Sequence, residues 1–217
     1  MKFKIYTILF FIISLLPSIA FSSLIVFDNT TTTTGEYSSS LREFGDEITL
    51  GGSNRLVKEF SFGYRIFYEL YPSETYGDET ARIRFRANDG LGGIPGTVLY
   101  DSGVFAIDYL KNEHQITNLS VQVPDTFTWT VIFGGIEVTG NASLVQFDPP
   151  TIGSSGNFAW FDDVVQGWKA WSGQRPDGSI IPMNYNARVI ADPVPEPATM
   201  FLLGLGLMGL AGVRRKI

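Results

Sequence analysis

Alternation of mostly apolar with mostly polar residues recurs in three stretches of the chain, and it constrains the fold more than any other feature. In residues 60–71 the apolar side chains alternate with Arg65, Phe67 and Glu69, in residues 81–87 with three arginines, and in residues 127–133 with two threonines. A period of two places alternate side chains on opposite faces of a β-strand. Each stretch therefore predicts a strand with one packed face and one polar face, as in an antiparallel sheet.

Shorter apolar runs separated by glycine-rich turns continue this pattern to residue 190, and no stretch shows sustained helical periodicity. About ten short strands of this kind predict an all-β domain, an antiparallel two-sheet sandwich that is jelly-roll-like. We place this sandwich domain at residues 41–191. Residues 21–40 precede it and are expected to form one strand, Leu24–Phe27, followed by a flexible Thr/Ser-rich segment.

The first 20 residues have the three parts of a secretory signal peptide. Lys2 and Lys4 precede an apolar run over 5–16, and Ser18-Ile19-Ala20 is a small-x-small cleavage site. Cleavage is expected after Ala20, or as a second choice after Ser22; the alternative is an uncleaved membrane anchor. The sequence therefore predicts export.

The other end of the chain has a second membrane segment. The sixteen residues 198–213 are uncharged and span about 24 Å as a helix, somewhat less than a ~30 Å hydrocarbon core. Arg214, Arg215 and Lys216 follow directly and should stay on the cytoplasmic side. Residues 198–217 thus predict a transmembrane helix with a basic tail, joined to the domain by a proline-rich stalk at 192–197. The alternative is a buried terminal helix of a soluble domain.

The order of Pro195-Glu196-Pro197, apolar helix and basic end resembles the PEP-CTERM sorting signal of exopolysaccharide-producing Gram-negative bacteria. The resemblance implies that a membrane transpeptidase of the exosortase type recognises the tripeptide and removes the helix. It also implies a transient anchor in the inner membrane, then a place at the cell surface or outside the cell, with exopolysaccharide as a further partner. Residues 88–103 resemble a segment of many surface-anchored bacterial β-domains, and residues 123–130 and 149–155 look like parts of exported PEP-CTERM proteins. The resemblance supplies no catalytic residue.

The charge and cysteine content exclude several functions. Five of the 16 basic residues lie in the two terminal segments, residues 1–20 and 198–217. Residues 21–197 contain the other 11 basic residues and all 22 acidic ones, a net charge of −11. So acidic a domain is not expected to bind nucleic acid, because phosphate contacts need basic surface. The chain has no cysteine, which excludes disulfides, thiol catalysis and cysteine-ligated metals.

The sequence contains little evidence for a catalytic site. His114 is the single histidine and lies in a polar stretch, where we expect it to be exposed and without a role. Acids such as Glu59, Glu69, Asp162 and Asp163 could pair as in glycosidases, but among 22 acids some pair is always available. We therefore expect neither enzymatic activity nor a cofactor.

Calcium at Asp46-Glu47 or at Asp162-Asp163 is the one metal alternative that the sequence leaves open. It is weak, because calcium takes six to eight oxygens from a shaped loop and no EF-hand motif is present.

Three tryptophans, Trp160, Trp168 and Trp171, fall within twelve residues in a stretch that suits a hairpin at a sandwich edge. Two interpretations are open. They are core residues, as large aromatics mostly are, or they stack on the apolar faces of sugar rings. In the second case Trp168 and Trp171 are the more exposed pair, and Trp129 belongs to the core in both.

The arginine ladder, Arg82, Arg84 and Arg86, has two interpretations as well: it neutralises carboxylates on neighbouring strands, or it grips an acidic polysaccharide. We favour the first, because the domain has an excess of acids.

These observations favour an exported surface or extracellular-matrix protein with a structural or adhesive role in exopolysaccharide or biofilm. The alternative is a carbohydrate-binding module that uses the late tryptophans. A glycan-active enzyme is the third choice.

Overall fold

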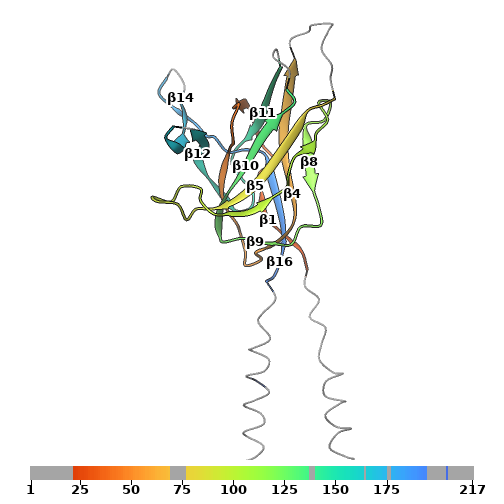
Figure 1. Cartoon of the computed structure of the whole chain (residues 1–217). Coiled ribbons are helices and arrows are strands. Elements are labelled where there is room, and N and C mark those ends of the chain that lie inside the picture. The colour runs from red at the N-terminus through yellow and green to blue at the C-terminus, as the bar shows by residue number, and fades with distance from the viewer. Residues whose placement is uncertain are drawn as a thin grey trace, which may run out of the picture.

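The computed structural model of the chain describes residues 22–68, 77–136, 140–163, 165–174, 177–194 and Gly204. Between residues 22 and 194 the described chain consists of β-strands with the turns and loops that join them (Figure 1). In chain order the strands are β1 (Leu24–Asp28), β2 (Thr33–Ser39), β3 (Phe44–Thr49), β4 (Leu56–Tyr68), β5 (Thr80–Ala87), β6 (Val98–Asp101), β7 (Phe105–Ala106), β8 (Glu113–Ile116), β9 (Val121–Gln122), β10 (Thr126–Gly134), β11 (Gly140–Phe147), β12 (Ser154–Asp163), β13 (Gly167–Trp171), β14 (Gly173–Gln174), β15 (Ile180–Ile181) and β16 (Ala187–Asp192).

Two large antiparallel sheets pack against each other. Sheet 1 has the order β1-β16-β4-β11-β2, with β8 and β9 also paired to β4, and sheet 2 has the order β13-β12-β3-β10-β5-β6, with β7 paired to β5. The chain crosses between the sheets from β3 to β4 to β5, and again from β10 to β11 to β12. This alternation gives the jelly-roll-like sandwich that the sequence predicts.

The core lies between the sheets and is built from the three strands with the alternating pattern. Phe60 of β4 lies 5.1 Å from Phe85 of β5 and 5.2 Å from Trp129 of β10, measured between ring centroids. All three side chains are fully buried. Aromatic pairs in edge-to-face contact contribute about 1 kcal/mol beyond the area they bury. The predicted packed faces of β4, β5 and β10, and the core position of Trp129, are therefore confirmed.

Sheet 1 has a fork beside the long strand β4. The second half of β4 pairs with β11, and its first half pairs with β16. At the junction the backbone N–H of Gly63 donates to the carbonyl of Asn186 (3.0 Å), and the N–H of Asn186 donates to the carbonyl of Val145 (2.8 Å). Asn186 thus joins the two halves of the sheet at the point where β11 and β16 meet.

A buried asparagine directly after β1 also contacts both strands at this fork. The Asn29 side-chain amide donates to the carbonyl of Phe147 at the end of β11 (2.8 Å) and to that of Tyr185 just before β16 (3.1 Å). Because Asn29 is fully buried, these two bonds satisfy carbonyl groups that water does not reach.

The Thr/Ser-rich segment differs from its prediction. Residues 33–39 form the edge strand β2, which pairs with β11 from Phe147↔Thr33 to Ser143↔Ser39. The prediction of a flexible segment is wrong for these residues. Threonine and tyrosine fit a pleated surface well, and an edge strand needs few apolar residues because most of its side chains stay exposed.

The single histidine also differs from its prediction. His114 lies in β8 opposite Phe62 of β4, and its ring stacks on Phe105 with 4.5 Å between centroids. Burial lowers the pKa of the His114 imidazole, and the charge of Lys111 lowers it further. The expectation of an exposed histidine is wrong, because β8 is a polar strand that turns His114 and Ile116 inward and leaves Glu113 and Gln115 exposed.

The first strand begins and the last strand ends at the same side of the sandwich, the lower side in Figure 1. Leu24 at the start of β1 pairs with Ala191 near the end of β16. The predicted signal peptide at 1–20 lies outside the described residues, and of the predicted transmembrane segment at 198–217 only Gly204 is described. Within the described part of the chain, no helix has the length and apolarity to cross a membrane.

Candidate functional site

The three late tryptophans lie on the hairpin of β12 and β13, but not on one face of it. Trp160 pairs with Ala170 and Asp162 with Trp168, so Trp160 and Trp168 share the outer face of sheet 2. Trp171 lies opposite Ala159, which is fully buried in the core, and therefore points to the inner side. The structure thus does not bring the three indoles together into one platform.

Their environments differ accordingly. Trp160 is only 8% exposed, with its indole Nε1 3.4 Å from Glu47 Oε2. Trp168 is half-buried beneath Arg86, whose Cζ lies 5.2 Å from the ring centroid. Trp171 is 53% exposed and meets Phe161 edge-on at 5.9 Å. Only Trp171 presents a large free aromatic surface.

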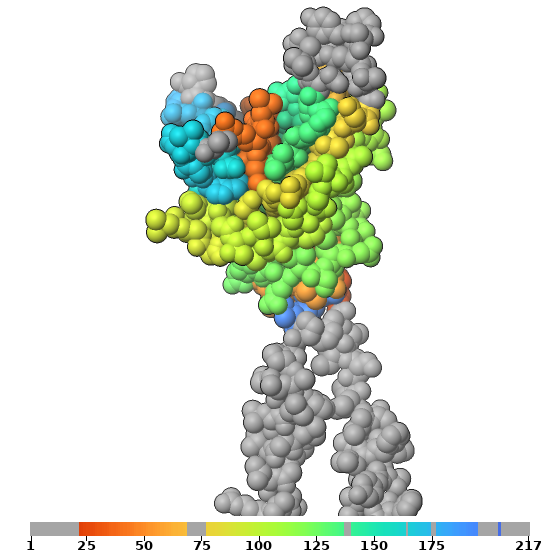
Figure 2. All heavy atoms as spheres, in the orientation of Figure 1, coloured from red at the N-terminus to blue at the C-terminus, as the bar shows by residue number. Residues whose placement is uncertain are grey.

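Trp171 lines a cleft of about 580 Å³ between the free edges of the two sheets. One wall is the β12–β13 hairpin with Phe161, Lys169 and Trp171; the other is β2 and the turn after it, with Ser38–Ser40 and Arg42. Figure 2 shows the hairpin (cyan) beside β2 (orange). An exposed indole with nearby hydroxyl and cationic groups is suited to a sugar, whose C–H face stacks while its hydroxyls are bound.

The arginine ladder is neutralised, as favoured from the sequence. Arg82 and Arg84 both bind Asp101 of β6, at 2.8 Å and 2.9 Å from their Nε atoms. Arg84 also contacts Glu43, which accepts a further bond from Arg86 Nε at 2.8 Å. These long side chains cover the centre of the outer face of sheet 2. Thr128 and Thr130 of β10, which the alternation places on the polar face, are therefore fully buried beneath them.

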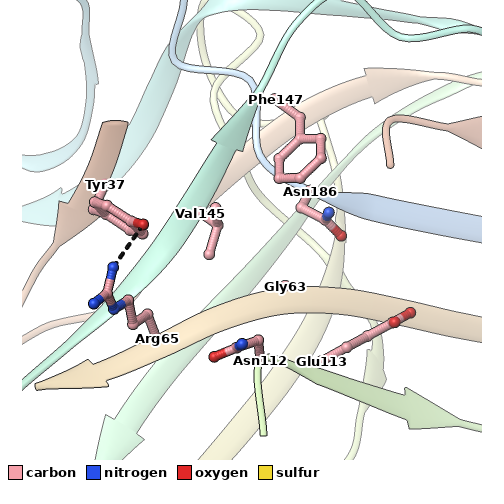
Figure 3. Close-up of a pocket in the computed structure, with 8 residues that line it drawn as sticks. All are labelled: Tyr37, Gly63, Arg65, Asn112, Glu113, Val145, Phe147 and Asn186. Carbon is pink, nitrogen blue, oxygen red and sulfur yellow. Dashed lines mark hydrogen bonds between the residues drawn. The ribbon is translucent and has the colours of Figure 1, made fainter. Parts of the chain in front are cut away.

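A second hollow, of about 440 Å³, lies on the outer face of sheet 1 over the fork (Figure 3). Gly63 and Val145 form its floor; Tyr37 and Arg65 stand on one side, and Asn186 with Phe147 on the other. Gly63 is required here because a Cβ at this position would lie 2.8 Å from the Asn186 side chain. The sequence did not indicate this hollow; the only signal was Arg65 next to Phe67 on the polar face of β4.

Asp46, one of the calcium candidates, is fully buried instead of facing solvent. Its carboxyl oxygens lie 2.7 Å from Ser155 Oγ and 3.1 Å from the donating N–H of Tyr185. Burial raises the pKa of the Asp46 carboxyl well above its ordinary value, and the hydrogen bond from Ser155 only partly offsets this. Among the residues that the structure describes, no three acidic or histidine side chains are grouped closely enough to hold a metal ion.

The hydrogen bonds around Ser155 agree with a protonated Asp46. Ser155 Oγ also lies 2.9 Å from Asn184 Oδ1, and Asn184 Nδ2 donates to Asp148 Oδ1 at 2.6 Å. Ser155 Oγ donates to Asp46 Oδ1 in the structure and also lies 3.2 Å from the Gly156 carbonyl, so its single proton faces three acceptors. Protonation of Asp46 would reverse the Asp46–Ser155 bond and leave the hydroxyl proton for one of the other two acceptors.

The predicted sorting residues Pro195, Glu196 and Pro197, and the basic cluster Arg214, Arg215 and Lys216, lie outside the described residues. Comparison with protein families supplies what the structure does not: residues 193–216 match the model of the PEP-CTERM protein-sorting motif. The chain carries a PEP-CTERM sorting motif. The PEP-CTERM motif implies export, membrane-associated sorting and processing by an exosortase. It begins directly after Asp192, the last residue of β16. A search of curated proteins gave no match.

Proposed function

We propose that the chain is an exosortase-processed protein that takes a structural or adhesive place in an exopolysaccharide matrix and turns over no substrate. The observation that carries this proposal is the PEP-CTERM match at residues 193–216, directly behind the last strand of the sandwich. An N-terminal signal peptide, a C-terminal membrane helix and a final location at or beyond the cell surface belong to the same proposal.

The placement of two reactive side chains supports a role without catalysis. His114 is packed against Phe62 and Phe105, where its ring serves as part of the sandwich. Asp46 is enclosed by Ser155 and the backbone of Tyr185. Neither group lines the cleft or the hollow on sheet 1, so neither has access to a substrate bound at these surfaces. Of the acids considered from the sequence, Asp162 and Asp163 do line the cleft, where Lys169 pairs with Asp163 at 3.5 Å.

The test is the Glu196→Ala variant, expressed in a host that has a matching exosortase. The change leaves both prolines of the tripeptide in place, and we expect it to block removal of the tail, because the carboxylate between two rigid residues is the feature for an enzyme to recognise. Mass spectrometry of the extracellular and membrane fractions measures the outcome. Replacing Arg214, Arg215 and Lys216 together should instead disturb orientation before processing begins.

Glu36→Ala is the matched control, since it makes the same change in the exposed part of β2. Its tail should be removed at the wild-type rate. Trimming of the Glu196→Ala form near residue 195 at that same rate would contradict exosortase recognition, and full-length protein confined to the cytosol would contradict export.

Carbohydrate recognition at the cleft is a second candidate, favoured by the exposure of Trp171 beside Lys169 and Arg42. A glycan array separates it from a purely structural role. Trp171→Ala should lower glycan binding about tenfold or more, as expected for loss of an aromatic anchor worth ~1.5 kcal/mol or more. Trp168→Ala removes an indole on the opposite face of the hairpin and should leave binding at the cleft unchanged. Equal binding by wild type and Trp171→Ala would exclude the cleft.

A further inference from the structure

The hollow on the outer face of sheet 1 contains an arginine, Arg65, that forms no ion pair with any acid in the described part of the chain. Among the described residues, no carboxylate lies within ion-pair distance of Arg65. This is unusual in a domain with a net charge of −11, where Arg55, Arg82, Arg84, Arg86 and Arg188 each bind a carboxylate. Arg42 at the cleft is the other described arginine without one. We propose that the hollow binds a carboxylate-bearing saccharide and that the Arg65 guanidinium receives its carboxylate.

The guanidinium of Arg65 is held in place by aromatic rings and not by an acid. Its Cζ lies 4.0 Å from the ring centroid of Phe67 and 5.1 Å from that of Tyr37, and its Nη1 donates to the Tyr37 hydroxyl at 2.8 Å. The two rings meet edge to face at 5.6 Å. A guanidinium has five N–H donors in a planar fork that matches a carboxylate. Because the neighbouring rings already orient this fork, less conformational entropy is lost when an anion binds.

The opposite side of the hollow offers groups for the rest of a sugar. Asn112 and Asn186 bring side-chain amides, which donate to and accept from hydroxyls, and Phe147 brings an aromatic ring (Figure 3). Gly63 and Val145 form the floor between these groups and Arg65. This distribution of a cation on one side and amides on the other fits a ligand that is charged at one end and rich in hydroxyls at the other.

Glu113 is the second charged residue that lines the hollow. It lines the same hollow from the start of β8, on the side away from Arg65 (Figure 3). Its carboxylate accepts hydrogen bonds from hydroxyls and repels a negative charge placed beside it, so a bound sugar acid is oriented with a carboxylate toward Arg65 and hydroxyls toward Glu113.

The choice of a saccharide as the carrier of the carboxylate rests on the proposed function, which places the chain among extracellular polysaccharides. The anion site itself rests on Arg65 alone. The test uses trigalacturonate and its methyl ester, two ligands that differ in charge but hardly in shape. Titration calorimetry of the full-length chain in non-ionic detergent measures binding of each.

We expect the wild type to bind trigalacturonate at least about tenfold more tightly than the ester, because a hydrogen-bonded charge pair contributes ~1.5–3 kcal/mol. Arg65→Gln should lose that preference, and Arg65→Lys, which keeps the charge without the planar fork, should retain part of it. Arg188→Gln is the matched control: it removes the same charge from an arginine of sheet 1 that is already paired with Asp28. Its preference should equal that of the wild type.

Equal affinity for the acid and the ester, no binding of trigalacturonate at millimolar concentration, or an unchanged preference in Arg65→Gln would each overturn the inference. Arg65 is exposed, so its substitution should leave the fold intact, and circular dichroism checks this. These outcomes are separable from failure of the proposed function. A chain that reaches the matrix but shows no acid preference keeps its proposed function and loses this site, whereas a chain that stays in the cytosol can still show the preference in vitro.

Discussion

Asp46 and Glu43 are two buried carboxyls a few residues apart whose pKa values shift in opposite directions. Burial raises the pKa of both, but around Glu43 the hydrogen bonds from Arg86 and Thr130 and the two arginine charges outweigh it, so that its pKa is lowered. Asp46 has no cation to compensate, and its pKa stays well above the ordinary value of 3.8. The pKa of Glu43 thus lies below that of a free glutamate, and the pKa of Asp46 lies above that of a free aspartate.

This difference predicts the pH dependence of an Asp46→Asn variant. Because the folded-state pKa of Asp46 is raised, its contribution to stability is fully present below about pH 3.8 and is lost as pH rises through the folded-state pKa. Asparagine does not ionise, so the variant should melt above the wild type near pH 8, and its advantage should shrink as pH falls toward 4. Thermal denaturation followed by circular dichroism at several pH values measures this. A difference in Tm that stays constant with pH would contradict a raised pKa.

Single residues also show where the sequence stops being informative. Alternation in β10 places Trp129 on the packed face, and the structure agrees. For Trp160, Trp168 and Trp171 the sequence gives the spacing but not the strand that lies alongside. Their burial depends on Glu47 and Arg86 from other strands and on the gap beside β2. Arg65 was missed for the same reason, since its aromatic partner Tyr37 comes from a strand that was predicted to be a flexible segment.

At the scale of elements, the polar network on sheet 2 joins strands that are distant in the chain. Glu43, just before β3, binds Arg84 and Arg86 of β5 and accepts a bond from Thr130 of β10 at 2.6 Å. Its side chain is only 5% exposed, so removing its charge leaves Arg86 without a carboxylate and Arg84 with Asp101 alone, in a poorly solvated place. We expect Glu43→Gln to lower the free energy of unfolding by about 3 kcal/mol at neutral pH.

Chemical denaturation measures this loss, and Asp125→Asn is its control. Asp125 binds Arg55 at 2.7 Å but its side chain is 80% exposed, so the same change should cost less than about 1 kcal/mol. The effect of Glu43→Gln should also fade as pH drops below about 4.5, because a lowered pKa stabilises the fold only above the unfolded value. Equal losses in the two variants would mean that the network contributes no more than a surface pair.

The strands that the sequence predicted best, β4, β5 and β10, have apolar residues at every second position over most of their length. β3 escaped prediction because it contains Gly45 and the buried Asp46 where apolar residues would mark a strand. A Cβ on Gly45 would lie 1.9 Å from the carbonyl oxygen of Trp129, so close packing against β10 removes the side chain that would have shown the pattern. β2 and β8 escaped because edge strands bury few side chains. Alternation therefore predicted the sandwich but not all of its edge strands, and the cleft lies between two such edges.

At the scale of the whole molecule, the chain has one attachment end and one open end. β1 starts and β16 ends at the same end, with Leu24 opposite Ala191, and the PEP-CTERM motif follows directly. β4 and β11 meet at the other end, where Gly140 pairs with Tyr68. A chain held through its C-terminal side would therefore present the cleft beside β2 away from its point of attachment.

This arrangement determines how the domain bears mechanical load. Inter-strand hydrogen bonds lie perpendicular to the strands, and β16 is flanked by β1 and β4. A pull between the C-terminal side and the far end runs along β16 and loads its bonds simultaneously in shear. A pull between the two termini peels β1 from β16 one bond at a time.

The chain has no cysteine, so Asn141→Cys gives a unique handle at the far end. In single-molecule stretching, unfolding from that handle should need more force than unfolding between the termini, and equal forces would contradict it. A chain tethered through its C-terminal side is then loaded along the direction in which sheet 1 is hardest to unfold.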